Sequence, residues 1–186
     1  MIDIRLGDSL EVLREFKDKS VDMILTDAPY DLSREQIEHF HNEFLRLSRE
    51  WVLVFMPPEN QWILPADQYL MWIKPISTKN TSRRYSRFVE MMFLYGNGTW
   101  NSDRHWSQYT NVFTDLVDDS RQHPFRKPPS LIVRLVLNHT NEGMTILDPF
   151  MGSGSVGEVC SKLNRNYIGI EKELAYFELA KRKFKS

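Results

Sequence analysis

The sequence predicts an α/β fold with a mostly parallel sheet that is covered by helices on both faces. Short, continuously apolar segments alternate along the chain with segments whose apolar residues recur at helical spacing. Strands that are apolar throughout are typical of a parallel sheet buried between two layers of helices. The length of 186 residues, of which 41% are hydrophobic, indicates one folded domain with a sizeable core.

Each predicted element has recognisable boundaries. The strand at 21–27 ends in the turn Ala28-Pro29, and the helix at 33–49 begins at the N-cap candidate Ser33, with Ile37, Phe40, Phe44 and Leu47 at helical spacing. The segment 97–127 has little periodicity, so we expect a loop with a short helix there. Further strands are predicted at 51–56, 69–73, 88–95, 144–148 and 166–171, and further helices at 128–140, after the glycine cluster up to Leu163, and at the C-terminus.

Composition restricts the class of protein. No apolar run approaches the roughly 20 residues that span a bilayer, and the N-terminus lacks a basic segment followed by an apolar one. The one cysteine, Cys160, cannot form an internal disulfide or a cysteine-rich zinc site. We therefore expect a soluble, cytoplasmic protein with no membrane partner.

A glycine-rich turn between two strands is the most informative C-terminal feature. Asp148 ends the first strand, Gly152 and Gly154 follow, and Glu171 ends the next strand. Glycines let the backbone approach a ligand, and an acid at the end of the following strand lies where dinucleotide folds bind a ribose. No Gly-Lys-Ser/Thr follows, which excludes a P-loop, and the nicotinamide fingerprint fits poorly. A ribose-bearing cofactor is thus favoured over an ordinary tight turn.

A second informative turn follows the strand at 21–27. Asp27, Ala28, Pro29 and Tyr30 place a carboxylate and an aromatic ring at a strand's carboxyl end, where open α/β sheets bind ligands. Pro29 fixes its own φ and restricts Ala28, so the turn is stiff. Asp27 is suited to accept a hydrogen bond from an amino group, and Tyr30 to stack on a flat base. The alternative is a surface turn whose aspartate caps the next helix.

Charge is unevenly distributed, although the formal net charge is only −1. The segment 74–87 contains no acid, and its basic residues are Lys74, Lys79, Arg83, Arg84 and Arg87. A run of this kind is either a solvated loop or a surface that contacts phosphates.

The two turns together resemble the motifs of the DNA amino-methyltransferases. In that family a DPPY-type motif is catalytic and a DPFxGSG-type motif binds S-adenosylmethionine; 27–30 and 148–155 match them here. The catalytic motif comes first, as in the circularly permuted β group. LGDSLEVL, WIKP and HPFRKPP match further family segments, so the resemblance covers nearly the whole chain. Alanine replaces the family's first proline at 28 but keeps the backbone carbonyl.

The resemblance implies a Rossmann-like fold and methyl transfer to the exocyclic amine of a flipped base. Asp27 and the Ala28 carbonyl would bond that amine while Tyr30 stacks on the base. Adenine N6 is favoured over cytosine N4, because aspartate at the first motif position is more frequent in adenine enzymes. Neither a metal nor a covalent nucleophile is implied. We expect Cys160 to be a core residue, which disfavours cytosine-C5 methylation.

The resemblance also implies roles for residues around the cofactor. Glu171 would bond the ribose hydroxyls, Asp8 would lie near the adenine, and Lys127 would offset the cofactor's carboxylate. Asp8 is also a candidate helix N-cap. The complete expected set is Asp8, His123, Lys127, Pro128, Asp148, Phe150, Gly152, Ser153, Gly154 and Glu171.

One domain is expected, with a catalytic half at 1–96, a short variable segment at 97–122 and a cofactor-binding half at 123–186. The variable segment has little room for a separate recognition domain. We therefore expect that the recognised DNA sequence is short and relaxed, that the loops 57–68 and 74–87 contribute to recognition, or that a second subunit does so, as in a homodimer.

A stand-alone enzyme on duplex DNA, in a restriction-modification or phage setting, is favoured. The alternatives are single-stranded DNA or RNA, a small molecule, or a non-catalytic binding protein.

Overall fold

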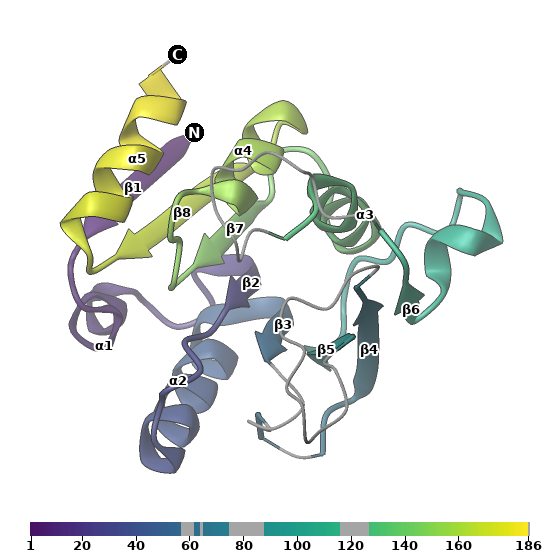
Figure 1. Ribbon diagram of the computed structural model, residues 1–186, viewed down its shortest axis with the longest axis horizontal. Coiled ribbons are helices and arrows are strands. Elements are labelled where there is room, and N and C mark those ends of the chain that lie inside the picture. The colour runs from purple at the N-terminus through teal and green to yellow at the C-terminus, as the bar shows by residue number, and fades with distance from the viewer. Residues whose placement is uncertain (57–61, 64, 75–87, 116–126, 186) are drawn as a thin grey trace, which may run out of the picture.

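The computed structural model describes residues 1–56, 62–63, 65–74, 88–115 and 127–185 (Figure 1). Its centre is one eight-stranded sheet with the strand order β1-β8-β7-β2-β3-β5-β4-β6. Within the described chain, neighbouring strands run parallel except where β5 pairs with β3 and with β4. The predicted mostly parallel sheet is confirmed. The strands are β1 (Ile2–Leu6), β2 (Val21–Asp27), β3 (Ser48–Met56), β4 (Gln68–Ile73), β5 (Val89–Gly96), β6 (Val112–Phe113), β7 (Thr145–Asp148) and β8 (Asn166–Glu171).

Helices cover both faces of the sheet, as the apolar strands predict. Alternate residues of β2 divide between the two faces: Met23 and Leu25 pack with α3 and α4, whereas Ile24 packs with α2. Helices α1 and α2 lie on one face, and α3, α4 and α5 on the other (Figure 1). The helices are α1 (Ser9–Val12), α2 (Arg34–Leu47), α3 (Pro129–His139), α4 (Ser155–Lys162) and α5 (Leu174–Lys185), with 3₁₀ turns η1 (Leu13–Glu15) and η2 (Trp106–Tyr109).

Local sequence sets the start of α2 as predicted. Ser33 Oγ accepts a hydrogen bond from the backbone N–H of Gln36 at 3.2 Å, and the Ser33 N–H donates to Gln36 Oε1 at 2.9 Å. This capping box satisfies two backbone donors that the first helical turn leaves open. The helix then buries the four apolar residues expected from its periodicity, Ile37, Phe40, Phe44 and Leu47.

The centre of the sheet contains a reversal of strand order. From β2 the chain passes through α2 to β3, whereas from β7 it passes through α4, on the opposite face, to β8. Because β2 and β7 are neighbours, their carboxyl ends open into a crevice between the two crossovers. In open α/β sheets this switch point is where ligands bind.

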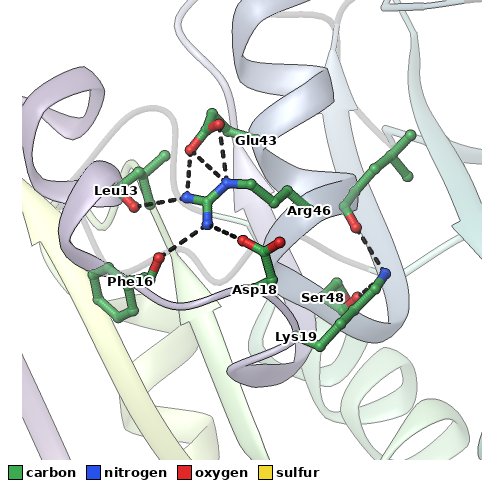
Figure 2. A network of polar contacts seen from close by, with 8 residues as sticks. Leu13, Phe16, Asp18, Lys19, Glu43, Arg46 and Ser48 are labelled. Atoms are coloured by element: carbon green, nitrogen blue, oxygen red, sulfur yellow. Dashed lines mark hydrogen bonds and ion pairs between the residues drawn. The ribbon is translucent and has the colours of Figure 1, made fainter.

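A guanidinium at the end of α2 fixes the chain that leads into β2 (Figure 2). Arg46 Nη1 donates to the Phe16 carbonyl at 2.9 Å and pairs with Asp18 at 2.7 Å, while Nη2 donates to the Leu13 carbonyl at 3.1 Å and pairs with Glu43 at 2.7 Å. The two carbonyls belong to the segment 13–18, which lies between α1 and β2 and, within the described chain, has no backbone hydrogen bonds to a neighbouring strand. The clamp thus holds η1 and the entry to β2 against α2.

Two strands of the structure were not among the predicted elements. β1, whose sequence alternates charged and apolar residues, pairs with β8 at the sheet edge, and the two-residue β6 pairs with β4. The predicted loop with a short helix is confirmed by η2 for the described part of 97–127. In the described chain, none of the helices has the length and apolar character needed to cross a membrane.

Candidate functional site

A cavity of about 480 Å³ lies at the carboxyl ends of β2, β7 and β8. It brings together the two turns that the sequence singled out, although they are far apart along the chain. Such a volume is within the range of sites for small molecules and cofactors. The expected site residues that line it are Asp8, Asp27, Ala28, Pro29, Tyr30, Lys127, Asp148, Phe150, Gly152, Ser153 and Glu171.

Among the described residues, only one oxygen of the Asp27 carboxylate has a hydrogen-bond partner. Asp27 Oδ2 accepts a bond from Lys127 Nζ at 2.6 Å, whereas Oδ1 is buried and has no hydrogen-bond partner among the described residues. Burial raises the pKa of Asp27, and the nearby Lys127 ammonium only partly offsets this. An unsatisfied buried acceptor beside a cavity costs free energy unless a ligand donates to it.

A buried carboxylate that the sequence analysis did not select, Glu90 of β5, lies behind Asp27. It is 2% exposed, forms ion pairs with Lys127 and, at 2.6 Å, with Lys74, and accepts a bond from the Tyr30 hydroxyl at 3.3 Å. Although burial raises the pKa of Glu90, the two ammonium groups bring it below its ordinary value. A lone acid within the apolar run FVEMMFLY was the sequence signal for this residue.

Asp148, at the end of β7, lies in a different environment from Asp27. Its Oδ1 accepts from Thr26 Oγ1 at 2.7 Å and from the Phe150 N–H at 3.3 Å, and its Oδ2 accepts from the Tyr167 hydroxyl at 3.3 Å. These donors are neutral, so burial dominates and raises the pKa of Asp148 to about 7. Its charge therefore changes near neutral pH.

The glycine-rich turn is shaped around Glu171. The Gly152 N–H donates to Glu171 Oε2 at 2.8 Å, and the Glu173 N–H donates to Oε1 at 2.8 Å, so that the carboxylate is fixed at the end of β8. Gly152 has φ +54°, and a side chain there would meet nothing within 4 Å, which leaves room for a ligand. Opposite this turn, Asp8 accepts from the Leu10 N–H at 2.8 Å and is the N-cap of α1.

Some expected site residues lie elsewhere. Gly154 and Pro128 do not line the cavity: Gly154 has φ +82° and lies so close to Phe184 that a Cβ would approach its ring to 2.9 Å. Lys127, by contrast, lines the cavity and bonds there to Asp27 and Glu90; its expected pairing with a cofactor's carboxylate stays a prediction. His123, Lys79, Arg83, Arg84 and Arg87 lie outside the described residues.

The described part of the variable segment begins at the opposite end of the sheet from the cavity. The Thr99 N–H donates to Glu50 Oε2 near the start of β3, and the Asn101 side chain donates to the Leu137 and Thr140 carbonyls at the end of α3. Trp100 packs edge-on against the buried His139, with ring centroids 5.1 Å apart. These contacts give residues 99–101 a packing role in the fold.

The expected core residues are buried. Cys160 is fully buried in α4, and burial raises the pKa of its thiol, which is unsuited to a nucleophile. Trp72 and Phe93, also expected in the core, are 3% and 1% exposed. Among the residues that the structure describes, no three His, Cys, Asp or Glu side chains are grouped so that they could hold a metal ion.

Comparisons with known proteins agree on one family. The sequence profile N6_N4_Mtase, described as DNA methylase, matches residues 65–182. The type II methyltransferase M.HpaI of Haemophilus parainfluenzae is 25% identical over 97% of this chain and 73% of its own length. The solved structure of the M1.HpyAVI–SAM complex is 28% identical, covers 98% of this chain and 100% of its own, and superposes with a TM-score of 0.80. The cytosine-N4-specific PvuII DNA methyltransferase, 16% identical over 98% of this chain and 86% of its own, shares the fold with a TM-score of 0.75.

Proposed function

The chain belongs to the DNA methylase family N6_N4_Mtase, and on that premise we propose how it acts: it is an S-adenosylmethionine-dependent DNA methyltransferase that uses the cavity at the switch point. The cofactor supplies an electrophilic methyl group, and the acceptor is the exocyclic amine of a base taken out of the stack. The motif-bearing strand β2 precedes β7 along the chain, which supports the permuted arrangement and the division into catalytic, variable and cofactor-binding segments.

The base-binding part of the proposal rests on Asp27 Oδ1, a buried oxygen without a hydrogen-bond partner in the part of the chain that the structure describes. Its other oxygen is fixed by Lys127, so Oδ1 is the acceptor left for an amine N–H, and the Ala28 carbonyl accepts from the second N–H. Two such bonds favour a tetrahedral nitrogen and release its lone pair from the ring. Tyr30, which lines the cavity and is 40% exposed, stacks on the base.

The cofactor-binding part rests on the residues at the ends of β7 and β8. Glu171 retains acceptor capacity for the ribose hydroxyls beyond its two backbone donors, and Gly152 leaves open space beside it. Asp148, Phe150 and Asp8 border the same cavity, and we assign the first two to the methionine part of the cofactor and Asp8 to its adenine. We assign Lys127 to a cluster with Asp27, Glu90 and Lys74, called the catalytic cluster, and no longer to the cofactor's carboxylate.

Adenine N6 is the proposed acceptor. The support is Asp27 at the first position of the catalytic motif, which in the resembling family is more frequent in adenine enzymes. The test is incubation of the chain with labelled S-adenosylmethionine and unmethylated DNA, followed by nucleoside analysis. Label in N6-methyladenine is the expected result; label in N4-methylcytosine would retain the reaction and overturn the choice of base.

Duplex DNA is the proposed substrate, bound in the bacterial or phage-infected cytoplasm. The run 74–87 begins at Lys74, which pairs with Glu90 beside Lys127, so phosphate contacts by Lys79, Arg83, Arg84 and Arg87 would follow directly after this cluster along the chain. A homodimer would supply the recognition surface that the short variable segment does not. Competition between duplex and single strands for methyl transfer separates the two substrates: faster transfer to single strands would overturn the duplex preference.

A further inference from the structure

Glu90 combines deep burial with contacts to three groups around the active site. Its side chain is 2% exposed and does not line the cavity, so it does not meet the substrate directly. One oxygen, Oε1, receives both Lys127 Nζ and the Tyr30 hydroxyl; the other, Oε2, receives Lys74 Nζ at 2.6 Å. Lys127 in turn bonds to Asp27, and Tyr30 is the proposed stacking ring.

We propose that Glu90 is a positioning residue, which orients the catalytic Asp27 through Lys127 and the stacking ring through the Tyr30 hydroxyl. This inference rests on the proposed function and adds a residue to it. A single carboxylate, anchored on the central strand β5, would fix both groups that hold the flipped base. Fixing them matters because a misplacement of about 1 Å at a reacting group costs on the order of 10²-fold in rate.

The balance of charges around Glu90 favours a role in positioning Asp27 over a role in core packing alone. Asp27 and Glu90 are paired with two ammonium groups, Lys127 and Lys74, so the cluster is neutral when all four are charged. Lys127 is 7% exposed, and its pKa is raised because the attraction of the two carboxylates outweighs its burial. A core that needed only packing would be stable with apolar groups in place of these charges.

The arrangement has a consequence for the titration of Asp27. The groups that face its carboxylate are Lys127, Lys74, Glu90, Tyr30 and Asp148. The negative charge of Glu90 opposes ionisation of Asp27, whereas the ammonium groups favour it. Removing the Glu90 charge alone therefore lowers the pKa of Asp27. Turnover that needs the Asp27 carboxylate then persists to more acidic pH. Turnover is also slower, because Lys127 and Tyr30 are no longer held in position by the Glu90 carboxylate.

The test measures turnover at saturating S-adenosylmethionine and duplex DNA across pH for Glu90→Gln, Glu90→Asp and Glu50→Gln. Glu50→Gln is the matched control, because Glu50 binds the Thr99 N–H at the opposite end of the same sheet. Glu90→Gln should lower turnover by about 10²-fold and move the acid limb to lower pH, with cofactor Kd unchanged. Glu90→Asp keeps the charge and shortens the side chain, so it should lower turnover without moving the limb.

The outcomes separate the inference from the function on which it rests. Equal acid limbs for Glu90→Gln and Glu50→Gln, or a loss of turnover that follows the loss of folded protein, would overturn the positioning role while wild-type transfer remained. No transfer to DNA by the wild-type chain would overturn the proposed function and the inference with it. A Glu90→Asp variant that folds but has wild-type turnover would also count against the role, because its shortened carboxylate cannot hold Lys127 as before.

Discussion

Asp27 and Asp148 end neighbouring strands, and their partners give them different properties. Asp27 has a cationic partner, Lys127, at 2.6 Å, whereas Asp148 accepts bonds only from neutral donors among the described residues. Burial raises the pKa of both carboxylates, but at Asp27 the Lys127 ammonium partly offsets the shift and leaves one oxygen to accept from an amine, whereas no charged donor offsets the raised pKa of Asp148 among the described residues. The difference originates in which residues the fold places beside each strand end.

The raised pKa of Asp148 predicts a pH-dependent cost in stability. Because burial raises the pKa to about 7 from an ordinary value near 4, the folded chain favours the protonated acid, and ionising it costs free energy as pH rises from about 4 to 7. Asp148→Asn removes that cost. Urea unfolding without cofactor should therefore show the variant gaining roughly 4 kcal/mol relative to wild type between pH 4 and pH 8. A difference independent of pH would contradict this.

At the scale of elements, the Arg46 clamp predicts a specific loss of stability. Arg46→Ala leaves the Leu13 and Phe16 carbonyls and the Glu43 carboxylate without their guanidinium donor, so the free energy of unfolding should fall by about 2 kcal/mol (Figure 2). Arg34→Ala, on the same helix, breaks one exposed pair with Glu38 and should cost less than about 0.5 kcal/mol. Thermal or urea unfolding measures both, and equal losses would refute the clamp.

Elements whose signals are local were predictable from the sequence. The strand at Val21–Asp27 follows from an apolar run, and the helix after Ser33 follows from an N-cap candidate and apolar residues at helical spacing. β1 was not predicted, because its charged residues Asp3 and Arg5 break the apolar run; it is a strand because β8 offers it an edge. The antiparallel direction of β5 depends on long-range pairing with β3, which periodicity does not encode.

The sequence predicted the site residues that belong to the two motifs, but it predicted few of the contacts made by residues outside them. Both turns line one cavity, because the strand order makes β2 and β7 neighbours. Glu90 was missed, and Lys127 was given a different partner, since the contact between them joins β5 to the chain before α3. Such contacts between residues distant along the chain are fixed by tertiary structure, and a single sequence carries only a weak sign of them.

At the scale of the whole molecule, a net charge of −1 requires any DNA affinity to come from a local basic surface. Replacing Lys79, Arg83, Arg84 and Arg87 by alanine should reduce the slope of log affinity against log salt by about three to four, at roughly 0.9 per phosphate contact. Fluorescence anisotropy on a short duplex measures this slope. Replacing Lys162, Lys181, Arg182 and Lys185 changes the net charge equally and is the control. Equal effects of the two sets would contradict a localised phosphate surface.

In the function that we propose, one cavity binds the cofactor at the ends of β7 and β8 and activates the amine at the end of β2. The most direct test compares wild type with Asp27→Ala for S-adenosylmethionine binding by calorimetry and for labelled methyl transfer to DNA. Since Lys127 keeps Glu90 as a partner, the variant should fold and bind the cofactor within about threefold of wild type, while transfer falls by at least about 10²-fold. Retained transfer, or equal losses of binding and transfer, would contradict the account.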